Sequence, residues 1–337
     1  CSAFDAWAHD YSARGGDVES GRRLAERRRS ALSTLIVGDP ARAIARAVPM
    51  RLRQRLPETI ASKLENRISA RGTLAVMAQI EGEGRAIYRE AVIGDRRYQT
   101  HVYGRRVNQG TLTNVPFHGI AVGQVMAVSE NPVRALESGE TPSPSAVVSN
   151  PSLDCPISSS KSDGKVAADV GGKITYLCSE GHIAALNEQY IEIETRTTPI
   201  LSFGGVLGPK RILYIRARYA DQASGYEPTT LSDAQSSMVA LDAFYNECSY
   251  GRLRVTGTFT PVVSLPGASN TYPDVASLLA PARSAALAAG YNYLDYDYEC
   301  IRYDGGPGST GTANVGARGC WLKSTGWSVA AHEFGHN

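Results

Sequence analysis

Val329-Ala330-Ala331-His332-Glu333-Phe334-Gly335-His336-Asn337 is the stretch of sequence that decides the fold of this chain. Its H-E-x-x-H pattern predicts a helix, because a spacing of four residues places His332 and His336 one turn apart on the same face. Two imidazoles so placed can share one Zn²⁺ ion, and Glu333 between them can act on a water at the metal. The apolar residues before the motif argue against a polar surface helix with two solvated histidines.

These residue types fit the hydrolysis of a peptide bond. The reaction needs a nucleophile at neutral pH and a positive centre that stabilises the oxyanion. Zinc supplies both, because it lowers the pKa of a bound water to about 7 and polarises the scissile carbonyl. We therefore assign His332 and His336 as metal ligands and Glu333 as the general base, which passes the proton of the water to the leaving amine. The motif predicts a zinc-dependent endopeptidase.

Length and composition are those of a globular protein with two or three domains. The chain has 337 residues, of which 42% are hydrophobic and 20% are charged, and its net charge is +2. This balance argues against nucleic acid as a partner. No stretch approaches the roughly 20 consecutive apolar residues of a membrane span. Because the chain begins at Cys1 and ends within the motif, we expect a fragment or a processed form of a longer protein.

Residues 206–337 have the sharpest patterning and are predicted to form the N-terminal half of a catalytic domain. Strands are predicted at 211–219, 252–264, 296–303 and 320–323, and helices from Ser232, over Asp274–Ala289 and from Ser328. This order predicts an α/β (α+β) half-domain with a mixed sheet on which the metal helix packs. Residues 305–319 are predicted to be a glycine-rich loop. The strand at 320–323 is expected to hold an extended substrate by edge pairing.

Local signals add detail to the two longer helices. Ser232, with Gln235 three residues later, predicts a capping box at the start of the first helix. Pro281 is expected to kink or break the second. An apolar stripe at steps of three and four is expected to face the core, formed by Leu231, Ala234, Met238, Leu241, Tyr245 and Cys248.

Three regions precede this half-domain. Residues 1–72 are rich in arginine and predict two or three helices with solvated basic faces. Residues 73–130 predict a small β-rich domain, such as a barrel. Residues 131–205 are expected to be a linker and the end of this leading part, with a strand pair at 173–177 and 190–195. The histidines outside the motif show no ligand spacing and are expected to be structural or surface residues: His9, His101, His118 and His182.

The motif and two upstream stretches resemble the metzincin zinc proteases, and within them the gametolysin (autolysin) family. Lys210–Ala217 is similar to the opening strand of that family, and Asn246–Leu253 to its first helix-to-strand junction. Only the zinc motif is highly specific. The resemblance implies a zincin-like fold and a secreted enzyme that cleaves extracellular or cell-wall proteins and glycoproteins.

The family pattern continues as H-E-x-x-H-x-x-G-x-x-H, with a methionine turn further on. The resemblance therefore implies a third histidine ligand beyond Asn337, because no histidine lies between His182 and His332. An acidic third ligand, as in other zincin branches, stays open. With two ligands alone, the chain as given is expected to bind zinc weakly and to be inactive.

The resemblance also implies that residues before about 205 form a propeptide that keeps a zymogen latent. Some metzincins block their zinc with a propeptide cysteine, and Cys155 and Cys178 are the candidates here. A Cys155–Cys178 disulfide is the favoured alternative, and a second disulfide is expected between Cys300 and Cys320. Six widely spaced cysteines permit three disulfides and an oxidising compartment, and buried free thiols are the other interpretation.

Two other classes of function stay open. The chain can be a non-catalytic zincin-like binding or structural module, or a non-metzincin zincin with an acidic third ligand. A weaker idea is that the basic residues 1–72 bind a polyanion, although the acidic residues between them argue against it. The sequence does not indicate the oligomeric state or the cleavage specificity.

Overall fold

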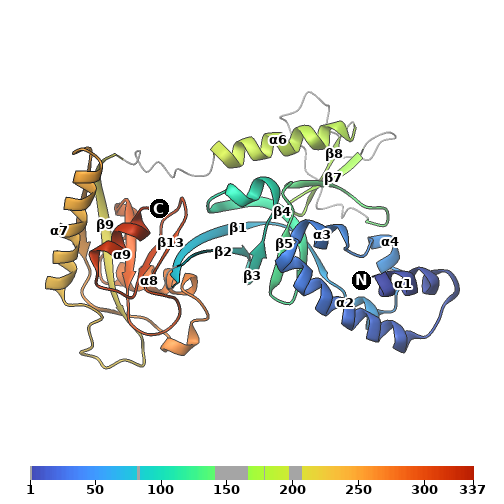
Figure 1. Cartoon of the computed structure of the whole chain (residues 1–337), viewed down its shortest axis with the longest axis horizontal. Helices are drawn as coiled ribbons and strands as arrows, with labels where there is room; N and C mark the ends of the chain where they lie inside the picture. Colours follow the sequence, from blue (N-terminus) through green and yellow to red (C-terminus); the bar gives the residue numbers. More distant parts are fainter. Residues whose placement is uncertain (1, 82–83, 141–165, 178, 197–206) are drawn as a thin grey trace. The chain divides into compact units, whose positions relative to one another are not determined.

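The computed structural model describes residues 2–81, 84–140, 166–177, 179–196 and 207–337. It confirms the predicted mixed α+β class and divides the chain into two compact units (Figure 1). Unit 1 comprises residues 1–75 and 89–197, and unit 2 comprises residues 76–88 and 198–337. No helix in the described part of the chain is both long enough and apolar enough to cross a membrane.

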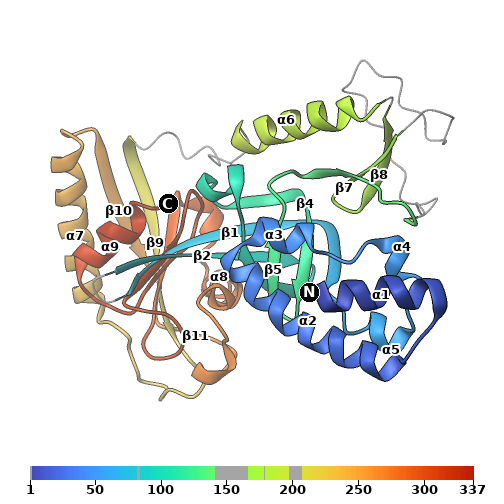
Figure 2. The same cartoon turned by 45° about the vertical axis from the view of Figure 1, so that its right-hand side comes forward.

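Unit 1 begins with helices that pack around a small core of their own. They are α1 (Ser2–Arg14), α2 (Val18–Gly38), α3 (Pro40–Ala45), α4 (Met50–Arg53) and α5 (Glu58–Ala61). Helices α1 and α5 both pack against α2, with Phe4, Ala25 and Ile60 buried between them (Figure 2). Asp17 caps α2, because its carboxylate accepts hydrogen bonds from the backbone N–H groups of Glu19 and Ser20.

The basic side chains of α2 are largely matched by acids. Arg22 forms ion pairs with Glu19 and Glu26 on the same helix. The buried side chain of Arg28 lies within 3.5 Å of Glu65. The predicted solvated basic face is therefore partly neutralised, which weakens the case for a polyanion site on this helix.

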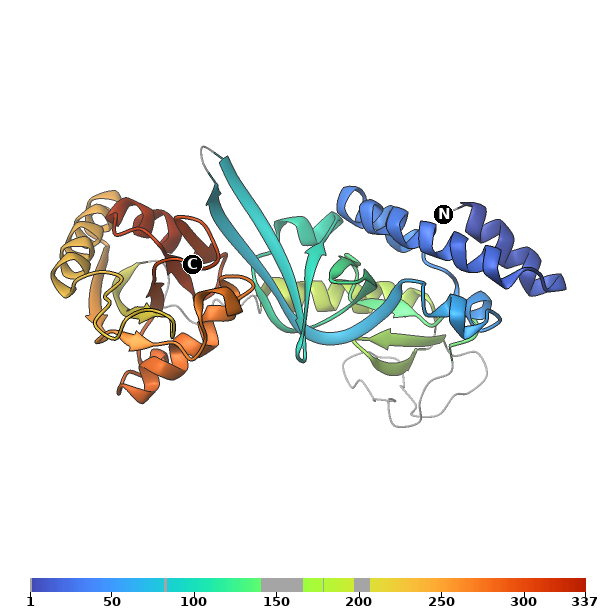
Figure 3. The same cartoon turned by 90° about the horizontal axis from the view of Figure 1, so that it is seen from below.

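The strands of unit 1 form a closed sheet. Its members are β1 (Asn66–Glu81), β2 (Gly84–Ile93), β3 (Arg96–His101), β4 (Leu112–Val122) and β5 (Val125–Val128), with a 3₁₀ helix at Gly104–Asn108. Residues 76–81 of β1 and 84–88 of β2 belong to unit 2. The order β1-β2-β3-β5-β4 closes because β4 also pairs with β1. Leu74, Phe117 and Met126 lie in its core. Figure 3 shows the long β1 and its neighbour β2, drawn in blue and teal.

A second, three-stranded sheet completes unit 1. It contains β6 (Val133–Ala135), β7 (Val166–Val170) and β8 (Lys173–Leu177), followed by α6 (Gly181–Arg196). The strand predicted at 190–195 is wrong, because those residues belong to α6. Ile183, Leu186 and Tyr190 recur at helical steps and pack on the strands, and this period overrides the short alternation.

Unit 2 is a sheet with helices on both faces. Its strands are β9 (Gly208–Arg218), β10 (Leu253–Phe259), β11 (Val263–Ser264), β12 (Tyr298–Arg302), β13 (Gly311–Asn314) and β14 (Cys320–Leu322). Its helices are α7 (Leu231–Cys248), α8 (Leu279–Ala288) and α9 (Trp327–Phe334), with 3₁₀ turns at Ser269–Thr271, Ala276–Leu278 and Tyr293–Asp295. The order is β10-β9-β12-β14-β13, in which the first four strands are parallel and β13 is antiparallel.

Two hydrophobic clusters lie on opposite faces of this sheet. One joins Leu213, Ile301 and Trp321 to residues of α8, such as Ala282. The other joins Ile212, Ala313 and Leu322 to α7 and α9 through residues such as Leu241 and Phe334. Figure 2 shows α7 and α9 next to each other, and these helices are in contact. Helix α9, which carries the H-E-x-x-H motif, therefore packs on the sheet, as the sequence predicts.

Three details of unit 2 differ from the sequence predictions. Helix α7 is capped by Thr230, whose hydroxyl accepts from the N–H of Asp233, and not by Ser232. The stripe is buried only at its centre, whereas Leu231 and Cys248 at its ends are exposed. The helix predicted over Asp274–Ala289 is divided into a 3₁₀ turn at Ala276–Leu278 and helix α8, so Pro281 lies in the first turn of α8, where its missing N–H removes no bond within that helix.

The prediction that residues 320–323 offer a free strand edge to a substrate is wrong. Strand β14 lies between β12 and β13, so both of its edges are already paired. The glycine-rich segment, predicted to be a loop, contains strand β13, which lies between β14 and residues 77–79 of β1. A strand of four residues that begins with Gly311 carries too little side-chain alternation to be recognised from the sequence.

His118 on β4 is held in a desolvated, positive environment within unit 1. Its Nε2 is buried and has no hydrogen-bond partner among the described residues. Burial, and then the charges of Arg134, Arg106 and Arg67, lower the pKa of His118 to about 3.

This shift predicts a pH dependence of stability for unit 1. The unfolded chain takes up a proton at His118 below its ordinary pKa of about 6.5, whereas the folded unit does not until about pH 3. The free energy of unfolding therefore falls as the pH falls below about 6.5, by about 2 kcal/mol at pH 5.

Urea unfolding of the wild type and His118→Asn between pH 7.5 and 5 measures the effect. We expect a smaller pH slope in the variant, and an unchanged slope in the control His9→Asn, which alters an exposed histidine. Equal slopes for the wild type and His118→Asn would contradict the assignment.

Candidate metal centre

Helix α9 lies tightly against the sheet and against α7. It begins after Gly326, and its residues Ala330, Ala331 and Phe334 are buried. The small alanine side chains let the helix approach the strands closely. The hydroxyl of Tyr245 on α7 donates a 2.7 Å hydrogen bond to the carbonyl of Ala331. These contacts fix the helix that carries the motif.

The two motif histidines converge. The Nε2 atoms of His332 and His336 are 3.0 Å apart, and the two rings are nearly perpendicular, at 80°. Two imidazole nitrogens bound to one tetrahedral zinc, each at 2.0–2.1 Å, would be separated by about 3.3 Å. The spacing of the pair therefore fits two ligands of a single metal ion.

Glu333 lies between them in the sequence and is fully buried. Neither of its carboxyl oxygens has a hydrogen-bond partner among the described residues. Burial raises the pKa of Glu333 to about 8. A buried carboxyl without a hydrogen-bond partner is unfavourable. A positive ion bound beside the two histidines would offset this cost.

Strand β13 provides the surface against which Glu333 packs. A Cβ atom at Gly311 would lie 2.5 Å from Oε1 of Glu333 and 2.6 Å from Cγ1 of Val329. Only glycine lets helix and strand come this close. The role of Gly311 cannot be recognised from the sequence, because a glycine in a glycine-rich segment carries no distinguishing signal.

Asn337 fastens the end of the motif to the β13–β14 connection. Its side-chain amide donates to the carbonyls of Asn314 and Ala317, each at 2.8 Å. The N–H of Gly316 donates to the carbonyl of His336, also at 2.8 Å. The sequence analysis missed this role of Asn337 as well. These bonds hold the backbone at His336 in place.

The rest of a metal centre is not found in the described part of the chain. No group of three His, Cys, Asp or Glu residues there is placed to hold a metal ion. A third ligand beyond Asn337 stays an expectation from the resemblance. The proposed latency residues Cys155 and Cys178 lie outside the described residues, as does their disulfide.

The disulfide predicted between Cys300 and Cys320 is not formed in this structure, in which both are free, buried thiols. They are direct neighbours in register on the parallel strands β12 and β14. Strands lie about 4.8 Å apart with parallel Cβ directions, whereas a disulfide needs Cβ atoms about 3.8 Å apart. The strands would have to move together to form the bond.

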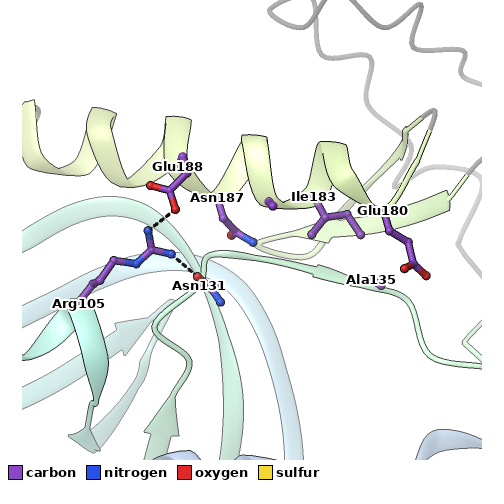
Figure 4. A pocket seen from close by; sticks show the side chains of 8 residues that line it. Arg105, Asn131, Ala135, Glu180, Ile183, Asn187 and Glu188 are labelled. Carbon is purple, nitrogen blue, oxygen red and sulfur yellow. Dashed lines mark hydrogen bonds and ion pairs between the residues drawn. The ribbon is translucent and has the colours of Figure 1, made fainter.

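Two cavities in the described part of the chain are lined by residues other than His332, Glu333 and His336. Figure 4 shows one of about 520 Å³ in unit 1, where Arg105 contacts Glu188 and Asn131. In unit 2, a cavity of about 180 Å³ is lined by Ile212, Tyr245 and Phe334, among others. Neither cavity is lined by the motif histidines or by Glu333, so neither identifies the centre.

Comparison with known proteins adds no assignment. No family model matches this chain, and no curated protein and no solved structure matches it significantly. The likeness to metzincins therefore depends on the residues of the motif and of the two upstream stretches.

The close approach at Gly311 predicts a cost for any side chain there. Gly311→Ala should destabilise unit 2 by about 1–3 kcal/mol, because the stiff, β-branched Val329 cannot move aside as a long side chain could. The matched control is Gly225→Ala, where an added Cβ meets nothing within 4 Å. Thermal unfolding measures both variants, and equal melting temperatures would contradict the packing described here.

Proposed function

We propose that this protein is a zinc-dependent endopeptidase. The observation that carries the proposal is the fully buried, unpartnered carboxyl of Glu333 beside two histidines whose Nε2 atoms are 3.0 Å apart. A helix that only needed stability would place an apolar side chain at Glu333, because unpaired buried carboxyls are unfavourable. A cation bound beside Glu333 would offset the cost of burying its carboxyl.

The ligand assignment follows from the chemistry of the donors. The Nε2 atoms of His332 and His336 would hold the ion, since neutral imidazole nitrogen is a preferred ligand of zinc. When bound, zinc supplies a Lewis acid that polarises the scissile carbonyl and makes water more acidic. Two ligands do not complete a zinc site, so the proposal includes a third, which we expect after Asn337.

Glu333 is assigned to the movement of the proton. Burial alone raises the pKa of Glu333 to about 8, so its role as a base requires the bound cation, whose charge would favour the carboxylate. That carboxylate can accept a proton from the attacking water at one oxygen and then deliver it to the nitrogen of the leaving amine. Gly311 limits how far this carboxyl can turn, because the backbone of β13 lies directly against it. A carboxyl confined in this way needs little reorganisation when the reaction begins.

The finer parts of the proposal depend on the sequence resemblance. The metzincin type, secretion, a zymogen form and substrates among extracellular or cell-wall proteins and glycoproteins are supported by the motif and by residues 210–217 and 246–253. Strands β9 and β10, into which these two stretches lead, are neighbours in the sheet.

Substitutions in the complete protein test the assignment. Glu333→Ala should keep zinc but lower casein hydrolysis by about 10²–10⁴-fold, because it removes only the proton carrier. His332→Ala should lose both zinc and hydrolysis. Zinc content by mass spectrometry and release of casein fragments are the two readouts.

The exposed His9→Ala serves as the control and should behave like the wild type. Full hydrolysis by Glu333→Ala would exclude the proposed mechanism. A wild type that binds zinc and cleaves no peptide would instead be a zincin-like binding module.

A further inference from the structure

A second cavity of about 520 Å³ lies within unit 1, between the closed sheet, the α3–α4 segment and the second sheet. Strand β4 contacts both α3 and β6 there. The lining contains an apolar group of side chains, formed by Ile44, Ala47, Met50 and Ile120, and a polar group from β1, β4, β6 and β7. Cavities that bind small molecules combine an apolar lining with a few placed polar groups in this way.

The register of β1 with β4 places four side chains on the cavity side of the closed sheet. Arg67 pairs with Ile120, and Ser69 pairs with His118. Because side chains alternate along a strand and paired residues share a face, these four lie on one face. Ile68 points to the other face and packs in the core of the closed sheet. Arg67 and His118 are diagonal neighbours across the pair, a separation that long side chains can bridge.

Two nitrogen atoms on this face are buried and have no hydrogen-bond partner among the described residues, namely Nε of Arg67 and Nε2 of His118. The Nε of Arg67 carries a hydrogen and is a donor. The imidazole of His118 is neutral near pH 7, because burial and the neighbouring arginines lower its pKa. A hydrogen bond to the backbone of Asn131 holds the single ring proton on Nδ1, so Nε2 is an acceptor.

The charged groups that line the cavity are paired with one another. Arg67 forms an ion pair with Glu137. Arg134 forms ion pairs with Glu140 and Asp169. A charged ligand would lose its hydration without gaining an unmatched counter-charge from these residues, which is unfavourable. The lining therefore favours a neutral ligand.

We propose that this cavity binds a small neutral alcohol, which is a molecule with a hydroxyl group and a compact aliphatic body. The hydroxyl group donates to Nε2 of His118 and accepts from the Nε–H of Arg67, and the aliphatic body contacts the apolar group of side chains. A carboxylate has no hydrogen to donate to His118, and an ammonium group has no lone pair for Arg67. The site belongs to unit 1 and is independent of the proposed peptidase function.

Titration of the full chain with cyclohexanol tests the proposal. The histidines are labelled with ¹⁵N, and NMR follows Nε2 of His118, because a hydrogen bond donated to this nitrogen changes its chemical shift. Cyclohexanol should bind saturably and move this signal. Cyclohexanecarboxylate and cyclohexylamine, which have the same ring and carry a charge at pH 7.5, should bind about tenfold more weakly or less.

Two substitutions locate the site. His118→Leu removes the acceptor, and Arg67→Lys removes the Nε donor but keeps a positive charge beside Glu137. Each should weaken the binding of cyclohexanol about tenfold or more. The matched control is His101→Leu, because Nε2 of His101 is also buried without a partner among the described residues but does not line this cavity. It should bind cyclohexanol like the wild type.

Circular dichroism checks that each variant is folded, and the wild type and Arg67→Lys decide the question if His118→Leu does not fold. Absence of saturable binding, or equal affinity of the wild type and Arg67→Lys, would overturn the site. A shift of the His101 signal without a shift of the His118 signal would also overturn it. Tighter binding of cyclohexanecarboxylate than of cyclohexanol would reject a neutral ligand.

Discussion

The contact between Glu333 and Gly311 sets the distance between helix α9 and the sheet of unit 2. The carboxyl of Glu333 takes the space that any side chain at Gly311 would fill. This close approach buries the alanines of α9 against β13 and β14 and leaves the last turn to carry the two imidazoles. The missing side chain at Gly311, on a strand of four residues, thus lets the helix that carries the histidine pair lie close to the sheet.

The same contact has an energetic consequence. Burial without a hydrogen-bond partner is unfavourable for a carboxyl, and the surrounding hydrophobic cluster must offset this cost. Proteins commonly concentrate such locally unfavourable groups where chemistry takes place. The Tyr245 bond to Ala331 and the Asn337 bonds to the β13–β14 connection keep this region in one arrangement.

The sequence predicts the parts of the fold whose signals are local. The H-E-x-x-H spacing identifies helix α9, and the alternation in residues 211–219 identifies β9. The sequence does not reveal features that depend on distant contacts. Gly311 matters only because Val329 and Glu333 pack above it.

Two errors have the same kind of cause. β14 was expected at an edge, yet β13 pairs beside it, and no local signal marks so short a strand. The C-terminal part of α6 has an alternating stretch, but the contacts of Leu186 and Tyr190 with the second sheet of unit 1 select the helical period. The motif gives no indication of the role of Asn337. Its side-chain amide donates hydrogen bonds to carbonyls at the β13–β14 connection, which precedes the motif in the sequence.

Strand β1 has a further consequence for how the protein folds. Met77 and Asn314 are partners in one sheet although residues 89–197 of unit 1 and most of unit 2 lie between them in the sequence. Closing so long a loop is entropically costly, so this pairing belongs to the late steps of folding. Until it forms, β13 is a bare strand edge that can pair with another chain and begin aggregation. Residues 77–79 cover this edge in the folded protein, so we expect its tendency to associate with other chains to end once they pair.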